Sequence, residues 1–116
     1  MIHIMEDIDW NEKNNKQLIN AFVSIKTEKE AICFLRDLMT KSEIREFANR
    51  LEAARLLLNN VQYTEIIKKT KLSSTTIARI SKWLKGPLGG YKIIIERLSK
   101  HHIHSQNSAG KGLFLY

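Results

Sequence analysis

A short run of hydroxyl side chains followed by two cations could recognise nucleic acid. Residues 73–76 read Ser-Ser-Thr-Thr, and Arg79 and Lys82 come shortly after them. Hydroxyl groups can hydrogen-bond to base edges, and the methyl group of threonine can contact the methyl group of thymine. Lysine and arginine attract phosphates, and that attraction weakens as salt is added. We therefore expect base contacts from three of these hydroxyl residues, Ser74, Thr75 and Thr76.

The segment 62–84 must position these side chains, and its pattern predicts a helix-turn-helix. A first helix begins at Glu65, Lys71 to Ser73 form the turn, and a second helix follows. Apolar residues of the two helices and the turn should hold the helices at a fixed crossing, namely Ile66, Leu72, Ile77 and Ile80. Ser73 is suited to cap the second helix, because its hydroxyl can accept from an amide of the first turn.

The turn carries lysine at a position where such turns often have glycine. We expect Lys71 to adopt positive φ, at a cost of about 1 kcal/mol for a residue with a side chain. A plain helical hairpin with a polar face is the structural alternative to a DNA-reading unit.

The positive charge is concentrated in the half of the chain that contains this segment. The whole chain has a net charge of +7. Residues 1–60 hold nine Lys/Arg and ten Asp/Glu, whereas residues 61–104 hold nine Lys/Arg and only two acids. A basic balance beside a candidate reading unit is typical of a protein that binds polyanions. The alternative is a solvated, lysine-rich surface without a nucleic-acid partner.

Length and composition favour one all-α domain in a reducing compartment. The chain has 116 residues, one proline and one cysteine, Cys33, so no disulfide can form within it. It has no 18-residue apolar run and no basic, apolar leader at its start, so we expect a cytoplasmic protein with no membrane partner. No nucleophile–base pair, metal cluster or phosphate loop is evident, so we do not expect an enzyme.

Three helices are expected before the reading unit. Residues 1–12 are acidic and read as an N-terminal arm, and residues 13–25 have one apolar helical face. Thr27 and Glu30 form a capping box before an apolar helix that ends at Met39. A second capping box, Thr40 and Glu43, opens the longest helix, about residues 41–58, which ends at Asn59-Asn60. Its inward residues are predicted to be Ile44, Phe47, Ala48, Leu51, Ala54, Leu57 and Leu58.

Residues after the reading unit should form a connection, one helix and a tail. Residues 85–90 hold three glycines and the only proline, and 91–99 read as a helix. Residues 101–116 are expected to be a flexible tail. It contains His101, His102 and His104, but no second ligand cluster accompanies them, and we predict no metal site.

The wide apolar faces of the first two helices favour a dimer. No helix of this chain is long enough alone to cover them, and large exposed apolar faces mark interaction sites. Two reading helices related by a two-fold axis would also contact two half-sites one DNA turn apart.

Several motifs together resemble the tryptophan-repressor superfamily, and the YerC/YecD-type branch in particular. They are Thr40-x-x-Glu43, Arg50, Leu57-Leu58-Asn59-Asn60, Tyr63-x-Glu65-Ile66, Thr76-Ile77-x-Arg79 and Gly89-Gly90-Tyr91-Lys92. The resemblance implies one domain over residues 13–100, with six helices and an intertwined homodimer. It also implies a bacterial transcription regulator that binds near-palindromic double-stranded DNA.

The resemblance also assigns residues. Family contacts to bases and phosphates fall on matching positions, which with the nearby cations give a predicted DNA-binding set of Thr64, Lys68, Lys71, Ser73, Ser74, Thr75, Thr76, Arg79 and Lys82. The positions around the tryptophan corepressor give a possible effector pocket of Thr40, Arg50, Arg79 and Ile80. Arg50 could instead form only an ion pair with Glu46, four residues earlier.

One departure from the family disfavours tryptophan as a ligand. Ile80 stands where the tryptophan repressors have a glycine beside the indole, and its place on the apolar stripe predicts an inward side chain. We therefore expect a DNA-binding repressor that needs no cofactor. The alternatives are a tryptophan-responsive operon repressor and a protein-interaction module that docks an acidic partner.

Overall fold

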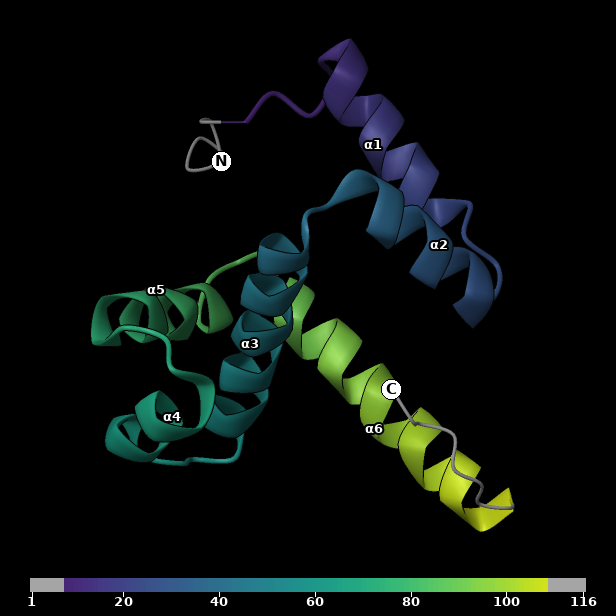
Figure 1. The fold of residues 1–116 in the computed structure, drawn as a ribbon. Coiled ribbons are helices and arrows are strands. Elements are labelled where there is room, and N and C mark those ends of the chain that lie inside the picture. The colour runs from purple at the N-terminus through teal and green to yellow at the C-terminus, as the bar shows by residue number, and fades with distance from the viewer. Residues whose placement is uncertain (1–7, 109–116) are drawn as a thin grey trace. The chain divides into compact units, whose positions relative to one another are not determined.

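The computed structural model describes residues 8–108, and for residues 101–108 it describes the backbone alone. The described residues contain helices and no strands, as predicted (Figure 1). The helices are α1 (Lys13–Val23), α2 (Glu28–Leu38), α3 (Lys41–Leu58), α4 (Tyr63–Thr70), α5 (Ser74–Leu84) and α6 (Gly90–Ser108). A single chain divides into two compact units, one ending at Lys41 and the other beginning at Ser42, and one domain over residues 13–100 stays a prediction.

The first unit contains α1 and α2, and side chains define where both helices begin. The carboxylate of Glu12 accepts from the amide of Asn15 at 3.0 Å. The hydroxyl of Thr27 accepts from the amide of Glu30 at 3.1 Å, which confirms the predicted cap. The carboxylate of Glu30 returns to the amide of Lys26 at 2.9 Å, one residue before the cap.

The two helices of this unit share a small aromatic contact but no buried core. The rings of Phe22 and Phe34 meet edge to face, with centroids 5.7 Å apart. Neither helix contains a buried residue, and apolar side chains such as Leu18 and Ile32 are exposed. This unit therefore leaves its apolar faces open in a single chain.

The second unit has a continuous core, to which α3, α4, α5 and α6 all contribute. Its buried apolar residues are Ala53, Ala54, Leu56, Ile66, Leu72, Ile77, Ile80, Leu84 and Ile95. The predicted inward face of α3 is therefore only partly right. Phe47 is 47% exposed and Ala48 is exposed, whereas Ala53 and Leu56 are buried. Small alanines suit this position, because they allow neighbouring helices to approach closely and pack at crystal-like density.

The longest helix has the predicted bounds, whereas two later helices are longer than predicted. α3 spans 41–58, and Asn60 follows it with φ of 62°, the left-handed geometry expected there. α4 begins at Tyr63 rather than Glu65. Its N-cap residue, Gln62, makes no side-chain hydrogen bond, so no capping motif in the sequence indicates this start. α6 continues to Ser108, so residues 101–108, predicted as tail, are helical.

Parts of the predicted arm and tail lie outside the described residues. These parts are residues 1–7 and 109–116, and the side chains of the three tail histidines are likewise outside the description. Within the described part of the chain, no helix is both long and apolar enough to cross a membrane.

Candidate nucleic-acid interface

α4, a three-residue turn and α5 form the predicted helix-turn-helix (Figure 1). Lys71 ends α4 with φ of 62° and ψ of 15°, so the expected left-handed turn residue is confirmed. Ser73 then returns the backbone to an extended conformation and caps α5. Ile66, Leu72, Ile77 and Ile80 are all buried, as the apolar pattern predicts.

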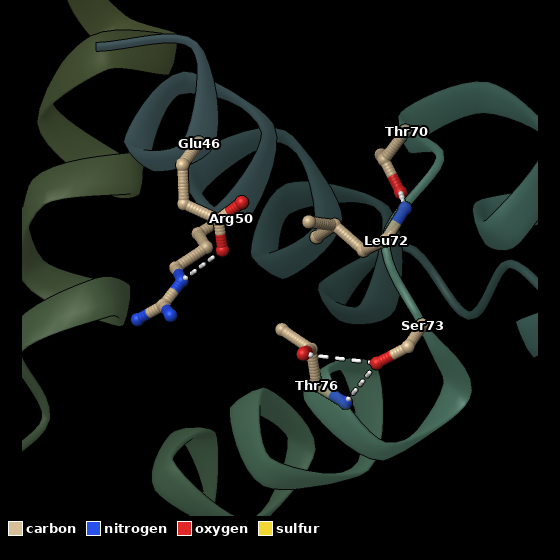
Figure 2. A network of polar contacts seen from close by, with 6 residues as sticks. All are labelled: Glu46, Arg50, Thr70, Leu72, Ser73 and Thr76. Carbon is tan, nitrogen blue, oxygen red and sulfur yellow. Dashed lines mark hydrogen bonds and ion pairs between the residues drawn. The ribbon is translucent and has the colours of Figure 1, made fainter. Parts of the chain in front are cut away.

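Ser73 and Thr76 form a small hydrogen-bonded cap at the start of α5 (Figure 2). The Ser73 hydroxyl accepts from the backbone amide of Thr76 at 3.1 Å. It also donates to the Thr76 hydroxyl at 3.1 Å. Thr76 is only partly exposed. Its hydroxyl is therefore engaged in the cap, which makes it a weaker candidate for direct base contact than Ser74 or Thr75.

Thr70 anchors the turn, a role that its place among polar residues did not reveal. Its side chain is 1% exposed. The Thr70 hydroxyl donates to the carbonyl of Ile66 at 2.8 Å. It also accepts from the amide of Leu72 at 3.3 Å (Figure 2). A buried amide without a partner is costly, so this hydroxyl stabilises the path of the turn.

The face of α5 opposite the core carries the predicted contact residues. Ser74, Thr75, Arg79 and Lys82 are all exposed. Ala78 is exposed among them, four residues after Ser74 and three after Thr75. Positions with these spacings share one helical face. Ala78 was not among the predicted contacts because its side chain is small and apolar, yet alanine can contact a thymine methyl group.

The remaining predicted DNA contacts lie on α4 and the turn. Thr64 is in the first turn of α4, Lys68 is in its last turn, and Lys71 follows it. All three are exposed, and so is the capping residue Ser73. One helix-turn-helix thus exposes eight of the nine residues of the predicted DNA-binding set, and the ninth, Thr76, is partly exposed.

The predicted effector residues have different surroundings. Ile80 is 0% exposed, so its inward orientation is confirmed. The guanidinium of Arg50 pairs with Glu46 at 3.0 Å (Figure 2). It also lies 5.7 Å from the ring centroid of Phe47. Arg79 is exposed, and Thr40 belongs to the first unit. The ion pair considered for Arg50 is therefore present.

An apolar cavity of about 570 Å³ lies where the end of α5, the connection and the start of α6 meet α3. Trp83, Pro87 and Tyr91 are among its lining residues, and none of the four predicted effector residues lines it. Burial raises the pKa of the Tyr91 phenol, because it disfavours the charged form. No local pattern in the sequence indicates this cavity, since its walls come from four separate segments.

Comparison with known proteins supports the resemblance. The model of a family described as Trp repressor protein matches residues 13–99. An uncharacterized protein YerC from Bacillus subtilis (strain 168) is 33% identical over 95 residues, which cover 82% of this chain and 91% of the relative. The crystal structure of a TrpR-like protein from Eubacterium eligens is similar, with a TM-score of 0.72 at 33% identity, and the match covers 78% of this chain and 93% of the other.

Proposed function

Because the chain belongs to the Trp repressor protein family, we propose that it is a sequence-specific, DNA-binding transcriptional regulator that acts as a repressor. The observation that carries the proposal is the division of α5 into two faces. Ile77, Ile80 and Leu84 are buried, while the opposite face exposes hydroxyl groups and cations. The buried face fixes the helix, and the exposed face is free to enter a DNA groove.

Different residues of this interface have different roles in the proposal. Ser74 and Thr75 contact base edges and so determine sequence preference. Lys68, Lys71 and Lys82 contact phosphates and so supply affinity for any duplex.

The regulator acts as a homodimer in the cytoplasm of a bacterium. The support for a dimer is the first unit, in which neither helix buries a residue in one chain. A second copy would cover these faces and would present a second reading helix. The DNA site is then a near-palindrome whose half-sites are about 10 bp apart, the spacing of one helical turn.

The regulator does not require tryptophan or any other cofactor. Ile80 is completely buried, so its side chain fills space within the core that a small-molecule ring would need. The runner-up function is a tryptophan-responsive repressor, and the observation that favours it is the retention of Arg50 and Arg79.

Selection of bound sequences from a random duplex pool tests the proposed function. The expected result is an enriched near-palindrome whose affinity falls steeply between low and physiological salt. Thr75→Ala should change the enriched sequence, whereas Lys100→Ala, on α6 and outside the predicted contact set, should leave it unchanged. Enrichment of no sequence, or affinity that does not vary with salt, would contradict the proposal and favour the interaction module.

Unfolding at several protein concentrations tests the homodimer. The thermal midpoint should rise with concentration, because association stabilises the folded state by mass action. A monomer mass in solution together with a concentration-independent midpoint would refute the dimer, and would not by itself refute DNA binding.

A further inference from the structure

A second cavity, of about 420 Å³, lies on the flank of α5 that carries Ser81 and Lys85. Its walls come from the end of α3, the last turns of α5 and the start of α6, all within the second compact unit. The volume is within the range of about 300–1,000 Å³ that is typical of small-molecule sites. None of the predicted DNA-contact or effector residues lines it.

The lining combines an apolar floor with a cationic rim. Leu57 is half-buried and Leu84 is buried, so they form the apolar floor, whereas the exposed Lys85 and Lys92 supply two ammonium groups at the rim. Ser81 and Asn60 add groups that can donate hydrogen bonds. Among residues 8–100, whose side chains the structure describes, no acidic residue lines the cavity and neither lysine has an ion pair.

This composition selects one chemical class of ligand. An apolar floor favours a hydrocarbon or aromatic body, and two unpaired ammonium groups favour an anionic head group. Lys85 and Lys92 are exposed, so a purely apolar molecule would gain nothing from their charge, and a small inorganic anion would gain nothing from the apolar residues. The matching ligand is an amphipathic anion, with a compact apolar body and a carboxylate or phosphate.

The cavity contacts α5 at the end remote from the candidate base contacts. Thr75 is in the first turn of α5, and Lys85 follows its last residue. Ten residues of helix separate them by about 15 Å along the axis. A ligand in the cavity would touch α3, α5 and α6 together, without occupying the face that carries Thr75. It could therefore change the position of the reading helix without competing directly for DNA.

We infer that this cavity is a regulatory site for an amphipathic organic anion, held by Lys85 and Lys92, whose binding changes the DNA affinity of the reading helix. The regulatory part of this inference rests on the proposed function. Binding in the cavity stands independently, because it can be measured without DNA.

The test is a titration of the full-length protein with naphthalene-1-acetate, followed by backbone amide NMR. Saturable shifts are expected at Ser81, Lys85 and Lys92. Two matched compounds separate the parts of the ligand. Naphthalene-1-acetamide keeps the ring without the charge, and acetate keeps the charge without the ring. Each should bind at least about tenfold more weakly than naphthalene-1-acetate.

Variants locate the site. K85Q together with K92Q should weaken binding by about tenfold or more, whereas K100Q, an exposed α6 lysine that does not line the cavity, should bind as the parent does. Equal binding of the acetamide, or undiminished binding by the double variant, would overturn the inference. Absence of saturable shifts would also overturn it, including the case in which a second copy of the chain covers the cavity.

A measurement of DNA affinity separates regulation from ligand binding. Saturating naphthalene-1-acetate should change the affinity of the parent for its selected duplex and leave that of the double variant unchanged. No change in the parent would overturn the regulatory role. Failure of ligand binding while the protein still selects a palindrome would leave the proposed function intact. Ligand binding by a protein that selects no DNA would instead contradict the proposed function.

Discussion

Replacing Lys71 with glycine should stabilise the protein, although it removes a charged residue. Lys71 has φ of 62°, a conformation in which its Cβ atom crowds the backbone. The left-handed conformation costs a residue with a side chain roughly 1–2 kcal/mol. Glycine avoids that cost but makes the unfolded chain more flexible, which offsets about 0.4–1 kcal/mol. The expected net gain in the free energy of unfolding is therefore about 0.8 kcal/mol, the difference between the midpoints of these two ranges.

Lys71→Ala is the matched control, because it removes the same charge but keeps a side chain in the strained conformation. Chemical denaturation of both variants at one protein concentration gives the comparison. The difference between glycine and alanine isolates the backbone term, since neither variant has the ammonium group. Lys69→Gly, within the last turn of α4, should instead destabilise by about 0.5–1 kcal/mol.

Lys71→Gly and Lys71→Ala should lose DNA affinity equally, because both remove the proposed phosphate contact of Lys71 and about one unit of the salt slope. If Lys71→Gly is no more stable than Lys71→Ala, the predicted backbone effect is wrong. That result would show that the turn does not hold this residue in left-handed geometry in solution.

Three further predictions concern the turn, the base contacts and the response to tryptophan. Thr70→Val keeps the shape of the side chain but leaves the buried amide of Leu72 unpaired, so it should lower the free energy of unfolding by about 1–3 kcal/mol; Thr70→Ser, which keeps the hydroxyl, should lose clearly less in the same denaturation assay. Thr75→Ala should reduce discrimination at one base pair by about 1–3 kcal/mol, whereas Lys82→Ala should weaken binding to all duplexes alike in a competition assay; the opposite pattern would show that the base-contacting residues are assigned incorrectly. Millimolar L-tryptophan should not shift the thermal midpoint, although a ligand at a hundred times its dissociation constant would add about 2.7 kcal/mol to the free energy of unfolding. A clear shift would favour the tryptophan-responsive repressor. Ile80→Gly should be less stable, and it is the variant in which a response to tryptophan could appear.

Local signals in the sequence predicted much of the fold. Thr27 and Ser73 cap α2 and α5 as expected, because a hydroxyl at a helix start has a specific partner three residues later. The bounds of α3 and the left-handed geometry of Asn60 and Lys71 were also predicted correctly. The burial of Ile80 followed from its spacing to Ile77 and Leu84 on one helical stripe.

Features that depend on distant segments were not predicted. The inward face of α3 was misassigned at Phe47, because helical periodicity shows which residues share a face but not which face another helix covers. The burial of Thr70 was not predicted, since nothing local distinguishes a buried threonine from an exposed one. Both cavities have walls from several helices, so their existence depends on tertiary packing that no single pattern in the sequence describes.

The open apolar faces of α1 and α2 have a consequence for the lifetime of newly made chains. With no buried residue in either helix, this unit has little to prevent local opening before it is covered, and such segments are preferred sites of proteolytic cleavage. If a second copy covers them, unpaired chains would be degraded faster than paired ones. The steady-state amount of the regulator would then rise more steeply than the rate of its synthesis, so a small change in expression would produce a larger change in occupied DNA sites.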